Sequence, residues 1–224
     1  MKTREAAKWA ETKSKLIADE VTLGPYMSFI VRRTPRRLLH LLSYYKFAAK
    51  MIGSGRRVLD VGCSEGFGTQ ILAENSARCV GVDIDEAAVA WGNKSVANER
   101  LRFLCADILK DRVGEFDAVV SLDVVEHIFT EHENEFMAAL RANLTHRGIC
   151  IIGTPNINSD QYANEHTRLG HVNLYSAERL RLLGERYFNH VFMFSANDEI
   201  VHTGFAPLAH YLIALCVDPT EPLH

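Results

Sequence analysis

The stretch Val58-Leu59-Asp60-Val61-Gly62-Cys63-Ser64-Glu65-Gly66-Phe67-Gly68-Thr69 decides the fold of this chain. A short apolar run is followed by a glycine-rich turn and then by residues with helical periodicity. This order is typical of a buried strand that leads through a tight turn into a helix. Such a turn lets a ligand approach the backbone closely, and the start of the helix offers it unpaired N–H groups. The segment therefore predicts a ligand site at residues 60–68.

The rest of the chain alternates short apolar runs with longer segments of helical periodicity. Their spacing is typical of βαβ units, in which helices join parallel strands. The runs are apolar throughout, as expected for strands that are covered on both faces. The sequence predicts an α/β fold with strands at 58–61, 79–83, 101–105, 116–122, 148–153, 191–194 and 210–217, and helices at 68–73, 86–96 and 177–186 and up to residue 144.

Composition sets the class of the protein. The chain has 224 residues, 47% of them hydrophobic and 24% charged, which excludes a disordered or fibrous protein. No apolar run reaches the roughly 18 residues of a membrane span. The five cysteines show no C-x-x-C spacing, and the N-terminus lacks the apolar core of a signal peptide, so we expect reduced thiols in a cytoplasmic protein. We expect a catalytic domain at 53–224 and, at 1–52, a helical extension that covers the site and is broken at Gly24-Pro25 and Thr34-Pro35.

Two classes of nucleotide ligand use a strand, a glycine-rich turn and a helix in this way. A dinucleotide site requires Gly-x-Gly-x-x-Gly, but the second and third glycine positions, counted from Gly62, are Ser64 and Phe67. Asp60 would also lie beside a doubly anionic pyrophosphate, whereas it suits a ligand that carries an ammonium and a sulfonium. An NAD-dependent oxidoreductase therefore remains only as an alternative.

Two further aspartates end the next two strands along the chain. Asp83 lies 21 positions after Gly62, where a carboxylate can accept hydrogen bonds from both ribose hydroxyls. Asp107 follows the third strand, within reach of an adenine amino group. A single such aspartate is typical of a helix cap or a solvated surface, but the joint pattern indicates a nucleoside site.

Four motifs in this order resemble those of the class I S-adenosylmethionine-dependent methyltransferases: 58–68, 81–85, 105–108 and 116–127. The resemblance covers residues 57–217 and implies a Rossmann-like, mainly parallel sheet of seven strands, the last one antiparallel, with helices on both faces. The family pattern usually has glycine where this chain has Ser64. The resemblance implies S-adenosylmethionine as the cofactor and S-adenosylhomocysteine as the product, with cofactor-binding residues at Asp60, Gly62, Cys63, Ser64, Gly66, Phe67, Asp83, Ile84, Asp107, Ile108 and Leu122.

A methyltransferase must align its acceptor with the methyl group and, for a hydroxyl acceptor, remove a proton. The candidates for this role, Asp123 and His127, follow the fourth strand. The pair Glu126-His127 is similar to a motif in O-methyltransferases of ubiquinone biosynthesis and related small-molecule enzymes. His127 is the leading candidate because an imidazole titrates near working pH. The alternative is that His127 packs as a structural donor.

Polar side chains after the fifth strand are candidates for acceptor binding, because ligands of open α/β sheets bind outside the carboxyl ends of the strands. We expect no metal, because Glu165, His166 and His171 have neither a cysteine partner nor a His-Glu-x-x-His pattern. The alternative for these segments is a solvated surface. The candidates are Asn156, His166, His171, Tyr175, Asn197 and His202.

Charge is divided unevenly along the chain, whose net charge is −3. Residues 1–57 contain 13 Lys and Arg against 4 Asp and Glu, a net +9, and residues 58–224 carry −12. The arginine cluster at 32–37, represented by Arg33, and the nearby Tyr26 would suit an anionic acceptor. The acidic domain disfavours nucleic acid as a partner. The alternatives are solvated arginines, or contact of residues 38–42 with a membrane surface.

The sequence thus predicts a methyltransferase that acts on a small polar or anionic acceptor. Oxygen is the expected acceptor atom, because the Asn-Pro-Pro-Tyr signature of adenine and glutamine N-methyltransferases is absent. The polar loops favour a sugar, a nucleotide sugar or a surface-glycan precursor, and residues 171–175 are similar to a segment of glycan-modification methyltransferases. The alternatives are a quinone or phenol O-methyltransferase at a membrane surface and a non-catalytic interaction protein.

Overall fold

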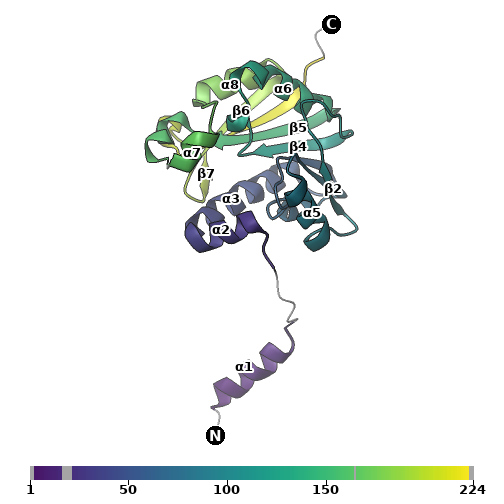
Figure 1. The fold of residues 1–224 in the computed structure, drawn as a ribbon, viewed down its shortest axis with the longest axis vertical. Helices are drawn as coiled ribbons and strands as arrows, with labels where there is room; N and C mark the ends of the chain where they lie inside the picture. The colour runs from purple at the N-terminus through teal and green to yellow at the C-terminus, as the bar shows by residue number, and fades with distance from the viewer. Residues whose placement is uncertain (1–2, 17–21, 164, 222–224) are drawn as a thin grey trace.

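The computed structural model describes residues 3–16, 22–163 and 165–221. Figure 1 shows a single sheet that crosses the molecule with helices on both sides. Its eight strands follow the order β3-β2-β1-β4-β5-β8-β6-β7. They are β1 (Arg57–Val61), β2 (Arg78–Asp83), β3 (Leu101–Cys105), β4 (Phe116–Leu122), β5 (Leu144–Pro155), β6 (Phe188–Asn197), β7 (Ile200–His202) and β8 (Tyr211–Pro219).

The first five strands are parallel, and the last strand of the chain runs against them. Pairs β1–β2, β2–β3, β1–β4 and β4–β5 are parallel, whereas β8 is antiparallel to both β5 and β6. The order of the strands reverses between β1 and β4. The chain continues from β1 toward one edge of the sheet and from β4 toward the other edge. This is the switch point at which open α/β sheets bind ligands, outside the carboxyl ends of the strands.

The sheet has eight strands, not the seven that the sequence predicts. The additional strand is β7, which pairs with β6 in a short hairpin within a segment that reads as a polar connection. Asn197 faces Ile200 across this hairpin, and Asp198 in its turn has a φ of 51°. Aspartate tolerates this left-handed conformation better than most residues, so polar turn residues here form a hairpin instead of an irregular loop.

Helices occupy most of the remaining chain, and none of the described ones is long and apolar enough to cross a membrane. The expected breaks at Pro25 and Pro35 are the starts of two helices, because proline fits the first helical turn, where its missing N–H is not needed. The α-helices are α1 (Arg4–Ser14), α2 (Pro25–Arg33), α3 (Pro35–Ile52), α4 (Thr69–Ala73), α5 (Glu86–Ser95), α6 (Glu133–Ala142), α7 (Glu165–Gly170) and α8 (Ala177–Glu185), and the 3-10 helices are η1 (Val125–His127), η2 (Thr130–His132), η3 (Ile157–Tyr162) and η4 (Ala206–Leu208).

Two hydrophobic cores lie on the two faces of the sheet. Alternate residues of a strand point to opposite faces, and β4 illustrates this: Val119 belongs to one core, and Ala118 and Val120 to the other. Helices α6 and α8 cover the first face, and α3, α4 and α5 cover the second (Figure 1). All five cysteines are free thiols, and four of them are buried.

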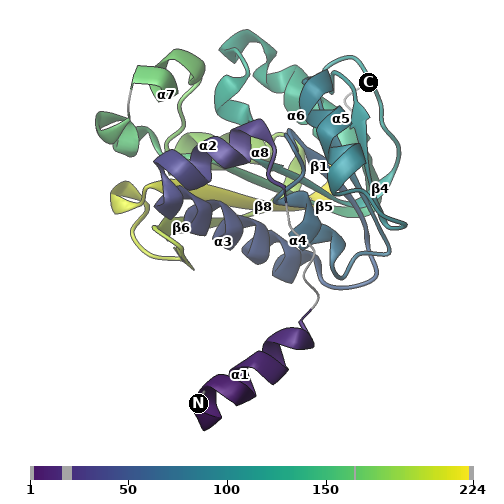
Figure 2. The same ribbon diagram turned by 60° about the horizontal axis from the view of Figure 1, so that its bottom comes forward.

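Helix α3 is packed into the same core as the sheet. Its residues Tyr44, Tyr45, Ala48 and Ile52 are buried in the core that it shares with the sheet, where α3 contacts β4 and β5. By contrast, α1 has no buried residue, and Figures 1 and 2 both show it apart from the body of the molecule. The division of the chain after residue 52 stays a prediction. Helix α3, which ends at Ile52, packs into the same core as the strands that follow it.

Candidate functional site

A continuous cavity of about 760 Å³ opens at the carboxyl ends of β1, β2 and β4. Its floor comes from the connections that leave these strands, at Gly62, Asp83 and Asp123. Its roof comes from α2 and α3, which contribute Tyr26 and Arg37 among others. The cavity therefore joins the glycine-rich turn to the residues after β4, which are 60 positions away in the sequence.

In the turn after β1, Gly62 and Ser64 both have the left-handed conformation. Gly62 has a φ of 78°, and a Cβ there would lie 2.2 Å from Cγ2 of Val124. Glycine is therefore required at this position by both conformation and space. Ser64 also adopts a left-handed φ, of 49°, and its N–H donates a 2.7 Å hydrogen bond to Oδ2 of Asp83. Serine thus takes the conformation for which the family usually uses glycine.

Asp83 and Asp107 both lie in the cavity wall, at the ends of β2 and β3. The second carboxylate oxygen of Asp83 accepts from the N–H of Asp85 at 2.9 Å, so backbone groups hold the side chain in place. A 2.7 Å hydrogen bond from Lys110 holds the pKa of Asp107 below its ordinary value. Both carboxyl groups are half-buried, which leaves them able to meet a ligand.

Asp60 is fully buried at the end of β1 and is not among the residues that line the cavity. Its carboxylate accepts hydrogen bonds from the hydroxyls of Thr69, at 2.6 Å, and Tyr45, at 3.4 Å. Burial raises the pKa of Asp60 to about 7, although both hydrogen bonds favour the ionised form. A positive charge in the cavity would stabilise this carboxylate, which has no cationic partner among the described residues.

Most of the other residues expected at a cofactor site also line the cavity. Gly66 is the exception, because it is buried beneath the turn against the ring of Phe103. The residues in the wall are Gly62, Cys63, Ser64, Phe67, Asp83, Ile84, Asp107, Ile108 and Leu122.

Glu65 has a role that sequence reasoning missed. Its buried carboxylate accepts hydrogen bonds from the backbone N–H groups of Tyr26, at 2.8 Å, and Met27, at 3.1 Å. Both N–H groups belong to the first turn of α2, where the helix itself offers them no acceptor. Gly24, the residue before the helix, has no side chain that could cap it. Glu65 therefore fastens the roof of the cavity to the glycine-rich turn.

Asp123 begins the second, polar end of the cavity. It has a left-handed φ of 57°, and its N–H donates to the carbonyl of Gly153 at 3.0 Å and to the hydroxyl of Tyr211 at 3.2 Å. Burial raises the pKa of the Asp123 carboxyl group, against the positive charge of Arg37. Strained backbone held by neighbouring strands is common at functional sites.

His127 lies near the cavity mouth with one ring nitrogen already engaged. Its Nδ1 is 2.8 Å from the carbonyl oxygen of Gly170, and a carbonyl can only accept. Nδ1 therefore carries the hydrogen, and Nε2 has the free lone pair. The side chain is exposed, so a proton taken up at Nε2 can pass to solvent.

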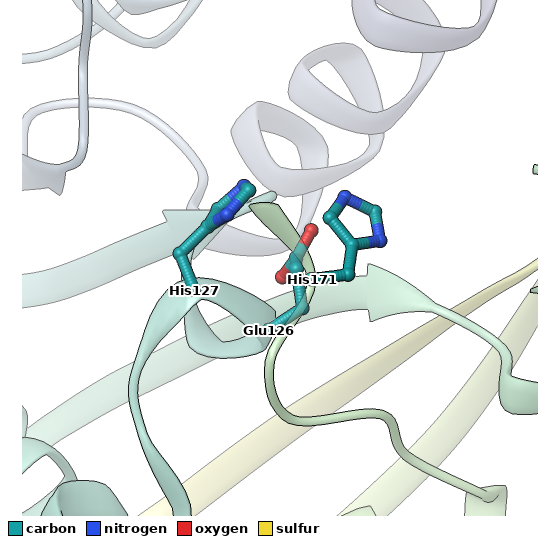
Figure 3. A group of neighbouring side chains, drawn as sticks. All are labelled: Glu126, His127 and His171. Atoms are coloured by element: carbon teal, nitrogen blue, oxygen red, sulfur yellow. The ribbon is translucent and has the colours of Figure 1, made fainter. Parts of the chain in front are cut away.

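Glu126 and His171 lie beside His127, and all three have a possible ligand atom within 4.8 Å of one another. Figure 3 shows the carboxyl group of Glu126 between the two imidazole rings. The rings meet edge to face, with their centroids 5.0 Å apart. Burial lowers the pKa of His171 to about 4, with smaller contributions from His127 and Arg37, so this imidazole is neutral at pH 7.

Comparison with known proteins agrees with this arrangement. The family model described as a methyltransferase domain matches residues 59–152, which include both the glycine-rich turn and the Asp123–His127 segment. This segment is similar to the methyltransferase domain, in line with the class I S-adenosylmethionine-dependent type that its motifs indicate. S-adenosylmethionine, and not a dinucleotide, is therefore the cofactor of this domain.

Relatives of known sequence match the methyltransferase domain over part of their length. A probable S-adenosylmethionine-dependent methyltransferase of Mycolicibacterium smegmatis is 31% identical over 124 residues, 52% of this chain and 44% of the relative. The mitochondrial ubiquinone biosynthesis O-methyltransferase of Bos taurus is 41% identical over 83 residues, 34% of this chain and 22% of that protein. The chain therefore spans less than half of the length of these relatives.

The fold of the methyltransferase domain also occurs in solved structures. The N-methyltransferase NodS from Bradyrhizobium japonicum WM9, solved in complex with S-adenosylhomocysteine, superposes with a TM-score of 0.59. The match covers 84% of this chain and 87% of NodS at 18% identity. This likeness concerns the fold alone.

The arginine that reaches the cavity of the methyltransferase domain is Arg37, not Arg33. Arg33 is exposed at the end of α2 and is not among the residues that line the cavity, whereas Arg37, Leu41 and Tyr45 all line it. These three residues are four positions apart, so they form one stripe along α3. This spacing was the sequence signal that could have selected Arg37. Tyr26, the other expected residue of this region, lies in the cavity roof.

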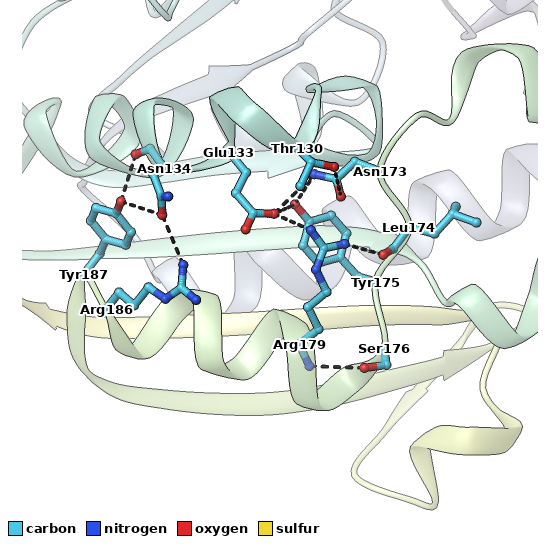
Figure 4. A network of polar contacts seen from close by, with 10 residues as sticks. All are labelled: Thr130, Glu133, Asn134, Asn173, Leu174, Tyr175, Ser176, Arg179, Arg186 and Tyr187. Carbon is cyan, nitrogen blue, oxygen red and sulfur yellow. Dashed lines mark hydrogen bonds and ion pairs between the residues drawn. The ribbon is translucent and has the colours of Figure 1, made fainter.

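Asn156 and Tyr175 hold the domain together instead of facing the cavity. The amide of Asn156 is buried and donates to the carbonyls of Ala206, at 2.8 Å, and Ala209, at 2.9 Å. The hydroxyl of the buried Tyr175 donates to Glu133 at 2.9 Å, in the network that Figure 4 shows around Glu133 and Arg179. Neither residue is among those that line the cavity, and their polar groups are satisfied internally, so the structure does not bring them to the acceptor end.

Asn197 and His202 also bond to one another outside the cavity. The N–H of Gly204 donates to Nδ1 of His202, so Nε2 carries the hydrogen and donates to Oδ1 of Asn197 at 2.8 Å. This pair links the two strands of the β6–β7 hairpin and is not among the residues that line the cavity. His171 does line the cavity, whereas the side chain of His166 lies outside the described part of the structure. The polar segment 157–173 contains η3 and α7.

Proposed function

We propose that this protein transfers the methyl group of S-adenosylmethionine to an oxygen atom of a small polar or anionic acceptor. The observation that carries the proposal is the continuous cavity that joins two chemically different ends. One end has the glycine-rich turn with Asp83 and Asp107, and the other has Asp123, His127 and Arg37. A cofactor and an acceptor can therefore occupy one enclosed space, as alignment for methyl transfer requires.

The residues at the first end fit the cofactor. The turn at 62–64 lets a ligand approach the backbone, and the buried carboxylate of Asp60 behind it favours a positively charged ligand. We assign the turn and Asp60 to the methionine part, Asp83 to the ribose hydroxyls, and Asp107 with Ile108 to the adenine. When bound, S-adenosylmethionine supplies a methyl group that its sulfonium makes ready for attack.

The residues at the second end supply the proton acceptor that a hydroxyl group needs. Nε2 of His127 has its lone pair free, since the carbonyl of Gly170 engages Nδ1. Asp123 is the second candidate, because it lines the same end of the cavity and its raised pKa makes it a better base than an ordinary carboxylate. The same end holds Arg37, whose guanidinium can bind a phosphate or carboxylate of the acceptor.

Replacement of His127 by alanine tests the proton transfer. We expect kcat to fall by about 100-fold or more, because general base catalysis contributes that much, while the affinity for S-adenosylhomocysteine stays unchanged. The matched control is His132→Ala, which removes an exposed histidine paired with Glu135. A His127→Ala protein with the kcat of the wild type would show that His127 does not accept the proton.

The whole proposal is tested by a titration followed by an acceptor panel. The protein should bind S-adenosylhomocysteine. It should also convert S-adenosylmethionine to S-adenosylhomocysteine when nucleotide sugars or sugar phosphates are supplied as acceptors. Binding of NADH alone would contradict the cofactor assignment. Cofactor binding without turnover on any acceptor would support a non-catalytic interaction protein.

A quinone or phenol acceptor is the second candidate, and exposed apolar side chains near the cavity favour it. Phe29 on α2, Phe129 after η1 and Leu169 on α7 are 55%, 57% and 74% exposed. A catechol acceptor and phospholipid vesicles distinguish the two candidates. Faster turnover of the catechol than of any sugar, with sedimentation of the protein with vesicles, would favour the second.

A further inference from the structure

We infer that Glu126, His127 and His171 form a binding site for one divalent transition-metal ion at the acceptor end of the cavity. The carboxylate and the two imidazoles come from two segments, η1 and the residue after α7, and converge within 4.8 Å (Figure 3). The inference deepens the proposed function, on which it rests, because it places the ion where the acceptor oxygen would bind.

The buried carboxylate of Glu126 is the first observation that points to a ligand. Oε2 accepts a 3.0 Å hydrogen bond from the hydroxyl of Thr154. The side chain is 0% exposed, and Oε1 has no hydrogen-bond partner among the described residues. A buried, unpaired carboxylate oxygen is costly, so such an atom usually has a partner that the protein itself does not supply.

The two histidines offer the neutral nitrogens that a metal ion requires. The hydrogen bond from Nδ1 of His127 to the carbonyl of Gly170 is the contact that typically orients a metal-binding imidazole and leaves Nε2 free. His171 is half-buried and also lines the cavity. Ligand atoms around one zinc ion lie about 3.4 Å apart, so small side-chain rotations close the observed separation.

The charges around the trio suit a divalent cation. Asp123 adds a second carboxyl group that interacts with Glu126, and Arg37 adds one positive charge. Burial raises the pKa of both carboxyl groups, so a cation would stabilise their ionised forms. Two imidazoles and one carboxylate favour Zn²⁺ or its first-row neighbours over Mg²⁺, which prefers oxygen ligands.

A metal ion at this position has a defined use in the proposed reaction. Three protein ligands leave at least one coordination position open, and the cavity lies next to His127 and His171. An ion held there would make an acceptor hydroxyl in the open position more acidic. It would also occupy Nε2 of His127, so in this metal-assisted form of the reaction Asp123, the second candidate base of the proposed function, would accept the hydroxyl proton.

Zinc binding to the metal-free full-length protein tests the inference. After dialysis against a chelator, we expect calorimetric titration with Zn²⁺ to show one strong site. Glu126→Gln and His171→Ala should each weaken this binding by at least about 10-fold, as loss of a contact at a metal site does. Glu126→Gln keeps an oxygen for Thr154 and so preserves the fold. Titration with Co²⁺ should also produce a visible absorption band in the wild type that is lost in both variants.

The control is His132→Ala, because His132 and Glu135 form an exposed histidine–carboxylate pair, 2.9 Å apart, with the same chemistry. This variant should bind Zn²⁺ like the wild type. Equal Zn²⁺ affinity in the wild type, Glu126→Gln and His171→Ala, or no binding at all, would overturn the inference. S-adenosylhomocysteine affinity is measured on the same samples, so loss of the metal site alone leaves the proposed function standing. Zinc binding without cofactor binding contradicts only that function.

Discussion

Ser64 shows how a single residue can depart from a family pattern without changing the turn. The left-handed conformation is unfavourable for serine by about 1 kcal/mol compared with glycine. The hydrogen bond from its N–H to Asp83 offsets part of this strain, because a backbone donor meets a carboxylate there. The presence of serine instead of glycine at position 64 therefore affects the stability of the turn more than its shape.

Asp60 should make the stability of the protein depend on pH. Its pKa of about 7 in the folded protein is above the ordinary value of 3.8, so folding takes up a proton between these values. The stability that this group contributes is fully present below pH 3.8 and is lost as the pH rises to about 7. We expect Asp60→Asn to stabilise the protein more at pH 8 than at pH 5, by on the order of 2 kcal/mol. Chemical denaturation at both pH values measures the difference, and an equal effect at both would contradict the assignment.

At the scale of elements, the connection between the glycine-rich turn and α2 is made by one carboxylate. Glu65 accepts two N–H groups at the start of α2, and a Cβ at Gly24 would lie 2.2 Å from its carboxyl carbon. The glycine before Pro25 thus makes room for a cap that comes from another segment. The sequence indicates the helix start but not the capping residue, because the two are about 40 positions apart.

Replacement of Glu65 by alanine should loosen this connection. We expect a loss of about 1 to 2 kcal/mol in the free energy of unfolding, as for other helix caps, and weaker binding of S-adenosylhomocysteine because α2 no longer stays on the turn. Thermal unfolding and calorimetry measure the two effects. Ser176→Ala is the matched control, since Ser176 caps α8 through the N–H of Arg179 on the other face of the sheet. A similar loss of affinity in both variants would show a general effect of stability.

At the scale of the whole molecule, α1 and α2 should differ in importance. Removal of residues 1–22 takes away α1, which has no buried residue. We expect the melting temperature to change by less than about 2 °C and the cofactor affinity to stay the same. Removal of residues 1–34 also takes away the buried Met27 and Ile30 of α2 and the roof of the cavity, so both quantities should fall. Weaker cofactor binding after the shorter truncation would contradict this division.

Patterns in the amino-acid sequence were enough to predict the class of fold, the strands of the sheet apart from β7, and the glycine-rich turn that forms one end of the cavity. These features depend on local patterns: apolar runs, a turn that needs glycine at Gly62, and aspartates that end successive strands. Such patterns reflect the backbone geometry of one segment at a time. The family resemblance used the same segments, because they lie in order along the chain.

Which polar residues meet in the cavity could not be predicted from the sequence, because it depends on the packing of distant segments. Arg37 reaches it because it lies on the stripe of α3 that faces the cavity, whereas Arg33 ends the preceding helix α2 and is exposed. Asn156 and Tyr175 do not line the cavity, and backbone carbonyls and Glu133 satisfy their polar groups. Glu126, His127 and His171 come together because the chain after β5 returns over the end of β4, with the N–H of Val172 bonded to the carbonyl of Glu126. Contacts between distant segments depend on how the elements pack, and a pattern within one segment carries no information about them.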